Sequence, residues 1–215
     1  MRVLSRVADL MILNLLATLF LIIPLTGGAA LTAMHYVLLK IVRDEDSYIV
    51  KGFWKSFKEN FRQATILWLI VLAVAFVIVA DYWFLYVMGA ALPFFYRYIL
   101  IAVTVILYMI FLYIFPLQSR FVNPIRQTLK NSMLMAFLGL PRTICMVIVT
   151  ILPWVMLYFF DLRILMVFML FGISVPGYVC ALLYNKLFKR FEPEPEPELS
   201  EEEELARAIS RMDEV

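Results

Sequence analysis

Four polar side chains that could do chemistry stand inside otherwise apolar segments: Asp9, Asn14, Thr26 and His35. Polar groups at membrane depth are costly and often mark a functional site. Asn14 is expected to hydrogen-bond a neighbouring helix, and Asp9 to pair with a nearby arginine, Arg6 or Arg2. Thr26 lies beside the predicted broken turn at Pro24 and could offer its hydroxyl to a solute. For His35, a packing role is favoured over a proton relay, because no carboxylate is near in sequence.

The chain lacks the motifs of the common catalytic and nucleotide sites. It contains no Walker lysine loop, no G-x-G-x-x-G, no G-x-S-x-G and no H-E-x-x-H. A single histidine cannot build a His-based metal site, and no Asp or Glu lies in the middle of an apolar stretch. The sequence therefore predicts a protein that is not an enzyme, with no cofactor and no metal. The missing buried carboxylates also argue against a proton-coupled carrier.

The four polar side chains lie in or next to long apolar stretches, whose fold must determine their positions. The chain is 64% hydrophobic with a mean hydropathy of +0.88, well above a soluble domain. Five stretches are long enough to cross a bilayer as helices: Leu10–Leu25, Ala64–Ala80, Leu100–Leu117, Thr143–Phe160 and Ile164–Leu183. Backbone in lipid must satisfy its own hydrogen bonds, so these segments are predicted to be helical. The predicted fold is an all-α, multi-pass membrane bundle.

Basic residues predict the orientation of this bundle. They gather in the connections after the first and third stretches and directly after the last one, whereas the other two connections hold only Arg97 and Arg163. Positive charge marks the cytoplasmic side. The C-terminus is therefore predicted to be cytoplasmic.

The N-terminus allows two arrangements. Five crossings would leave Arg2 and Arg6 outside, against the charge bias. The run Pro24–Gly28 can break the first helix, and residues 29–42 are apolar enough to return through the membrane as a sixth segment. Both arginines would then be cytoplasmic. We favour six segments, and five remain possible.

The segment Ser47–Arg62 has an amphipathic pattern. Apolar side chains at helical spacing share one face, and the basic residues that occupy the other are Lys51, Lys55, Lys58 and Arg62. Such a helix lies in the headgroup layer and contacts anionic lipid or a partner. We predict an interfacial cytoplasmic helix here, with a second cytoplasmic helix over residues 124–138.

Charge divides the chain into three parts. Residues 1–191 carry seventeen basic and seven acidic groups and form the predicted membrane domain. Residues 192–198 alternate Glu and Pro, which predicts an extended spacer. Residues 199–215 form an acidic cytoplasmic tail, either a short helix or disordered, that could dock on the basic inner face, dock on a partner, or stay in solvent.

Eight runs along the chain carry a resemblance to a known family: Ala8–Leu16, Pro24–Thr32, Leu39–Ile49, Phe53–Phe61, Arg120–Asn123, Gln127–Asn131, Leu140–Thr143 and Asn185–Lys189. In these runs the chain resembles YesL-type bacterial integral membrane proteins, over about residues 9–190. The resemblance implies a place in the bacterial cytoplasmic membrane and an association with carbohydrate-uptake ABC importers. It carries over no catalytic residue.

Two functions follow as expectations. The first is a non-enzymatic accessory protein whose partners are the lipid bilayer and the permease subunits of such an importer. The alternative is a small permease for a neutral solute such as a sugar, which would use the break at Pro24–Gly28. Nucleic acid is not an expected partner, and the sequence sets no oligomeric state.

Overall fold

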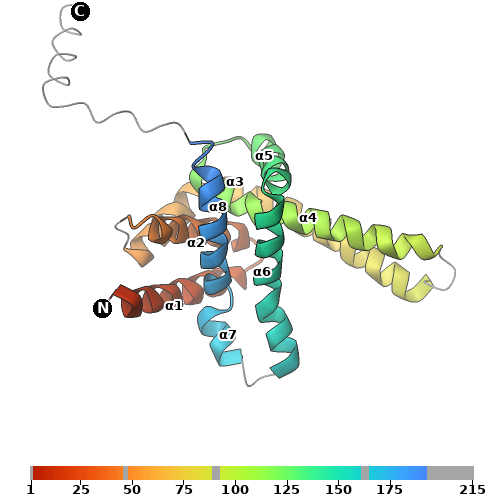
Figure 1. The fold of residues 1–215 in the computed structure, drawn as a ribbon, viewed down its shortest axis with the longest axis horizontal. Helices are drawn as coiled ribbons and strands as arrows, with labels where there is room; N and C mark the ends of the chain where they lie inside the picture. The colour runs from red at the N-terminus through yellow and green to blue at the C-terminus, as the bar shows by residue number, and fades with distance from the viewer. Residues whose placement is uncertain (1, 46–47, 89–92, 161–164, 193–215) are drawn as a thin grey trace, which may run out of the picture.

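The computed structural model describes residues 2–45, 48–88, 93–160 and 165–192 of the 215-residue chain. All regular elements in this part are helices (Figure 1): α1 Arg2–Leu21, α2 Gly27–Val42, α3 Ile49–Met88, α4 Phe94–Arg120, α5 Ile125–Leu138, α6 Leu140–Phe160, α7 Leu165–Phe171 and α8 Ser174–Phe188. The predicted all-α class is confirmed for these residues. The acidic tail at 199–215 and most of the Glu/Pro spacer lie outside them.

Helix α3 combines two elements that are predicted from the sequence as separate helices. It runs for 40 residues from Ile49 to Met88, about 60 Å at 1.5 Å per residue. The predicted interfacial helix Ser47–Arg62 and the predicted span Ala64–Ala80 are thus one continuous helix. The reason is local, because no glycine or proline interrupts residues 53–88. The second predicted cytoplasmic helix is found as α5, at Ile125–Leu138.

Fewer helices qualify as membrane spans than the five or six predicted. Among the described residues, α3, α4 and α6 are long and apolar enough to cross a bilayer. A fourth span results if α7 and α8, which are bent by 41° at a short break, count as one. Helix α2 has only 16 residues, short of the about 20 that a straight crossing needs, and α1 is not among the candidates.

A break is present close to the predicted one at Pro24–Gly28, but it lies earlier in the chain, and Gly27 and Gly28 already belong to α2. Helix α1 ends at Leu21 and α2 begins at Gly27, so residues 22–26 turn the chain back. The last predicted span, Ile164–Leu183, is also broken, at Gly172 and Ile173. Pro176 lies just inside α8, where the amide that it lacks would have bonded the preceding turn. The proline therefore favours a break at this position.

Helix α2 lies at the centre of the core and contacts α1, α3, α4 and α8. Its first turn packs directly against α3: a Cβ added to Gly28 would lie 2.3 Å from the carbonyl oxygen of Ala64 and 2.6 Å from Cβ of Trp68. Small residues allow such close helix packing. The Trp68 indole also donates a hydrogen bond to the carbonyl of Pro24, at 2.7 Å. These contacts fix the α1–α2 turn against α3.

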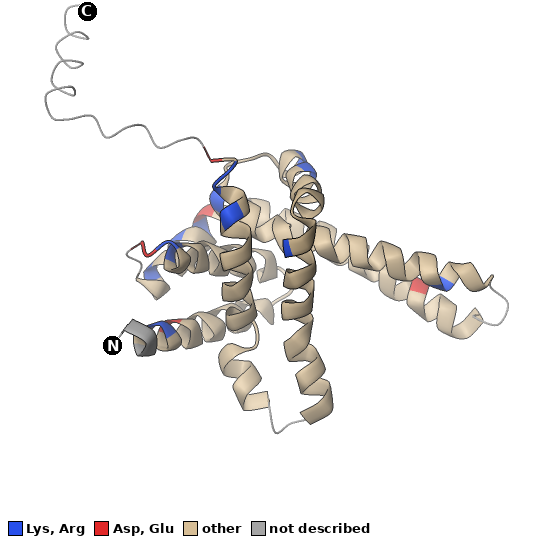
Figure 2. Cartoon of the chain, in the orientation of Figure 1, with Lys and Arg blue, Asp and Glu red and all other residues tan. Residues whose placement is uncertain are grey.

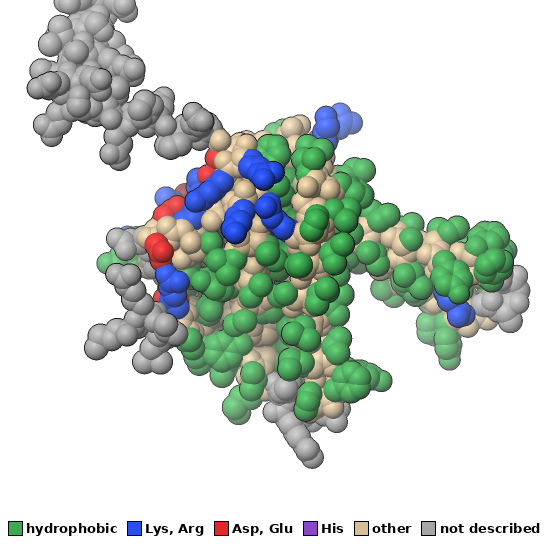
Figure 3. Space-filling view, in the orientation of Figure 1, with side chains coloured by type: hydrophobic (Ala, Val, Ile, Leu, Met, Phe, Trp, Pro, Cys, Tyr) green, Lys and Arg blue, Asp and Glu red, His purple; other side chains and the backbone are tan. Residues whose placement is uncertain are grey.

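Two apolar arms leave this core in different directions (Figure 1). One is the outer part of α3 with α4, and the other is α6 with α7. Hydrophobic side chains cover most of both arms, whereas most Lys and Arg lie around the ends of α2 and α8 and on the neighbouring helices (Figures 2 and 3). An apolar exterior of this extent is compatible with contact to a lipid bilayer.

Candidate functional site

Asn14 forms hydrogen bonds to the backbone on both sides of the break between α7 and α8. Its side chain is fully buried, and its amide nitrogen donates to the carbonyls of Met169 at 2.7 Å and Phe168 at 3.5 Å. Its oxygen accepts the amide protons of Ile173 at 2.9 Å and Ser174 at 2.7 Å. One side chain from α1 thus serves both ends of an interrupted helix.

This arrangement answers a physical requirement of a broken helix. The last carbonyls of α7 and the first amides of α8 have no partners within their own helices. In an apolar environment such groups must be satisfied by other protein groups. An Asn amide carries both donors and an acceptor, so it can serve both ends at once. The hydroxyls of Thr18 and Ser174 are also buried, without a hydrogen-bond partner in the described part of the chain.

A cavity of about 230 Å³ lies beside this break, between α2, α4, α6 and α8. His35, Tyr108, Thr150 and Gly172 contribute to its wall, and most other lining residues are aliphatic or aromatic. The Tyr108 hydroxyl donates to Thr150 Oγ1 at 3.0 Å, and His35 Nδ1 lies 3.1 Å from the Tyr184 hydroxyl. No Asp, Glu, Lys or Arg is among the described residues that line it. The cavity suits a small, uncharged and largely apolar occupant.

The other two predicted polar residues lie away from this cavity wall. The Thr26 hydroxyl donates to the carbonyls of Phe20 at 2.5 Å and Ile23 at 3.2 Å. It closes the turn after α1, and the predicted contact with a solute stays a prediction. Asp9 is half-buried, and Arg6 pairs with Asp44, just after α2, rather than with Asp9. The alternative partner, Arg2, has its side chain outside the described part of the chain.

The four predicted contact residues Lys51, Lys55, Lys58 and Arg62 are all exposed on the first half of α3. The apolar stripe behind them is divided. Phe53 and Phe57 are buried, and the rings of both pack at a tilt against Phe20 of α1. Trp54 stays exposed, with the Lys58 ammonium 5.3 Å from its ring centroid. This half of α3 is therefore docked on the core through two rings and presents its cations outward.

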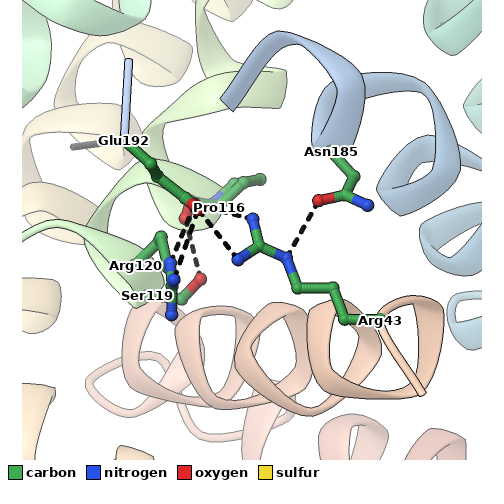
Figure 4. A network of polar contacts seen from close by, with 6 residues as sticks. All are labelled: Arg43, Pro116, Ser119, Arg120, Asn185 and Glu192. Carbon is green, nitrogen blue, oxygen red and sulfur yellow. Dashed lines mark hydrogen bonds and ion pairs between the residues drawn. The ribbon is translucent and has the colours of Figure 1, made fainter. Parts of the chain in front are cut away.

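A second cluster of polar contacts lies at the basic end of the molecule (Figure 4). Glu192, just after α8, receives the Arg43 guanidinium through two hydrogen bonds of 2.6 and 3.0 Å. Arg120, the last residue of α4, donates from Nε at 2.9 Å. Arg43 also donates from Nε to Asn185 on α8 at 2.9 Å. We call these four residues the arginine clamp. It ties the ends of α2, α4 and α8 together.

The clamp also sets the charge of its glutamate. The hydrogen bonds from Arg43, with a smaller contribution from Arg120, hold the pKa of the Glu192 carboxyl at about 2, below its ordinary value of 4.5, although partial burial opposes the shift. The side chains of Arg43 and Glu192 are 10% and 18% exposed. The carboxylate therefore stays charged at neutral pH. Sequence reasoning missed this site, because its members are far apart in the chain.

Comparison with known proteins finds a match for the first part of the chain alone. No curated protein and no solved structure matches it. Residues 8–82, which cover most of α1, all of α2 and most of α3, match a family model. That family includes the YesL-type proteins. Over these residues the chain is similar to the family described as "Protein of unknown function, DUF624".

Proposed function

We propose that this chain is a non-enzymatic accessory protein of the bacterial cytoplasmic membrane that binds the permease subunits of a carbohydrate-uptake ABC importer. The partner class comes from the resemblance to YesL-type proteins. The observation that carries an accessory role is the α3–α4 arm, whose outer half lacks the neighbours that a helix in a closed bundle has.

The arm is long and little covered. None of the described residues of α3 after Leu67 is buried, although this part continues for 21 residues to Met88. Trp68 at its base contacts the α1–α2 turn, and farther out this part of α3 runs beside α4 (Figure 1). Large side chains such as Phe76, at 74% exposed, face outward. A second protein can pack on such a helix pair within the bilayer, through van der Waals contact and interhelical hydrogen bonds.

The ion pair between Arg6 and Asp44 supports the six-segment arrangement. It joins the beginning of α1 to the end of α2, so the N-terminus lies on the same side as the basic connection that follows α2. In this arrangement α1 and α2 form an antiparallel hairpin. Arg2 and Arg6 are then cytoplasmic together with the C-terminus, as the charge bias requires.

Photo-crosslinking in native membranes tests the proposal. A photoreactive phenylalanine analogue replaces Phe76 on the arm or, as the matched control, Phe159 on α6, which is 73% exposed. The proposal expects Phe76 to crosslink an importer permease subunit and Phe159 to crosslink chiefly lipid. If neither position captures a permease subunit, and none co-purifies in detergent, the accessory role is wrong.

The broken helix beside the cavity favours one second candidate, a small permease for a neutral solute. Interrupted helices at membrane depth form solute sites in transporters. The hydroxyls of Tyr108 and Thr150 are hydrogen-bonded to each other, so the cavity offers a sugar few free hydrogen-bonding groups. A less polar solute fits the cavity better. Uptake into proteoliposomes that is abolished by Met146→Trp, which fills the cavity, would support this candidate. The absence of uptake for a panel of neutral solutes would reject it.

A further inference from the structure

The basic end of the molecule presents nine exposed cations, seven on α3, α5 and α8 and two just after α8. We call them the basic inner face: Lys51, Lys55, Lys58, Arg62, Arg126, Lys130, Lys186, Lys189 and Arg190. We propose that this face is the docking surface of the chain's own acidic segment, residues 193–215, and that Glu192 in the arginine clamp is its anchor. The occupant is thus a segment of the same chain, and anionic lipid is its competitor.

The anchor is visible in the structure. After α8 the chain turns back, with the amides of Phe191 and Glu192 bonding the carbonyl of Phe188 at 2.9 and 3.0 Å. Glu192 then enters the clamp, where two arginines bind its carboxylate (Figure 4). Glu192 is also the first member of the Glu-Pro repeat. The acidic segment therefore starts from a fixed point at the basic end.

Charge complementarity supports the rest of the contact. Residues 193–215 contain nine acidic residues and two arginines, a net charge of −7. None of the nine cations of the basic inner face forms an ion pair with another residue in the described part of the chain. Charges of opposite sign within about a Debye length, 8 Å at physiological salt, attract appreciably. A tethered segment reaches an effective concentration of the order of millimolar, which favours such a contact further.

The spacer gives the segment sufficient reach. A Glu-Pro repeat over residues 192–198 extends about 20 Å in the polyproline conformation, at 3.1 Å per residue. Residues 199–215 can then reach the cations at the end of α8 and on neighbouring helices. A docked segment would cover the same cations that otherwise meet anionic headgroups. Its presence would therefore weaken contact between this end and an anionic membrane surface.

Distance measurement between two spin labels tests the proposal. The labels are placed at Ser200→Cys and Lys186→Cys, in a Cys145→Ser, Cys180→Ala background, with the full chain in nanodiscs of neutral phosphatidylcholine. We expect a short-distance population in 50 mM salt that falls at least severalfold in 500 mM salt, because screening weakens the contact. A single broad distribution that does not change with salt would overturn the proposal.

Two single-charge variants separate the anchor from general attraction. Glu192→Gln and Glu214→Gln each remove one negative charge, but only Glu192 lies in the clamp. Glu192→Gln should reduce the short-distance population severalfold, and Glu214→Gln should leave most of it. Equal effects of the two variants would contradict the anchor.

Vesicle binding distinguishes the tail from lipid as the occupant. The chain ending after Glu192 should bind vesicles containing phosphatidylglycerol several times more tightly than the full chain, because the tail no longer covers the cations. A synthetic peptide of residues 193–215 added in trans should reverse this gain. If truncation leaves vesicle binding unchanged and the peptide does not bind, the face belongs to lipid alone and the proposal is wrong.

Discussion

Replacing Asn14 by leucine should loosen the break between α7 and α8. Leucine keeps the branching of the asparagine side chain at Cγ but is larger, and three short hydrogen bonds of 2.7 to 2.9 Å and one of 3.5 Å are lost. Hydrogen bonds in membrane proteins average about 0.6 kcal/mol, up to about 1.7. Buried backbone groups left without partners cost about 1–3 kcal/mol each. We therefore expect Asn14→Leu to lower the free energy of unfolding by about 2–4 kcal/mol.

The assay combines global and local readouts. Denaturant unfolding in detergent micelles reports the stability change, and amide hydrogen exchange of a peptide covering residues 165–178 reports the break itself. The amides of Ile173 and Ser174 bond Asn14 directly. A loss of about 2 kcal/mol corresponds to roughly thirtyfold faster exchange, because 1.4 kcal/mol is tenfold.

Asn131→Leu is the matched control. The Asn131 oxygen accepts a hydrogen bond from Gln127 at 3.2 Å on the exposed side of α5, so its loss should change stability by less than about 0.5 kcal/mol. If Asn14→Leu behaves like Asn131→Leu, and exchange at Ile173 and Ser174 is unchanged, then Asn14 does not hold the broken helix.

Three further predictions concern the core and the clamp. Gly28→Ala should lower the melting temperature and reduce the free energy of unfolding by about 1–3 kcal/mol, because the new Cβ would meet the Ala64 backbone at 2.3 Å. The control Gly139→Ala, whose new Cβ has its nearest contact at 3.2 Å to a flexible leucine, should lower stability less. Equal losses in the two variants would contradict the close contact between Gly28 and α3. Thr143→Val should cost about 1–2 kcal/mol in denaturant unfolding, because the buried Tyr113 hydroxyl loses its partner at 3.0 Å, whereas an unchanged unfolding midpoint would show that this bond is unimportant. For Glu192, the folded-state pKa of about 2 lies below the ordinary 4.5, so the clamp stabilises fully above pH 4.5 and loses this contribution as pH falls towards 2. The stability difference between the wild type and Glu192→Gln should be flat from pH 5 to 8 and shrink below 4.5, and a difference that persists unchanged at pH 2 would refute the assignment.

Local sequence signals predicted the positions of the helices better than the contacts between them. The turn near Pro24 and the helix Ile125–Leu138 follow from proline, glycine and apolar spacing, although the turn begins two residues earlier than predicted. The continuity of α3 was missed, because a change from an amphipathic to a uniformly apolar pattern looks like a boundary between elements. Without a helix breaker, hydrogen bonding carries the helix through such a change in environment.

The contacts of the polar residues depend on distant parts of the chain. An Asn in an apolar helix indicates a hydrogen bond across helices, but the choice of backbone groups about 160 positions away follows only from packing. The same holds for the arginine clamp. Arg43, Arg120 and Glu192 end or follow three separate helices, and only the packed fold brings those ends together.

Cysteine accessibility in intact cells tests the central claim most directly, namely that the apolar arms cross a bilayer with the basic end in the cytosol. Single cysteines are introduced at Lys55 and Lys189 on the basic end and at Tyr86 and Phe95 on the outer end of the α3–α4 arm, with Cys145 and Cys180 replaced. All four positions are exposed. A membrane-impermeant reagent should label Tyr86→Cys and Phe95→Cys in intact cells, and Lys55→Cys and Lys189→Cys only after permeabilisation. Labelling of the two lysine positions from outside would contradict the account.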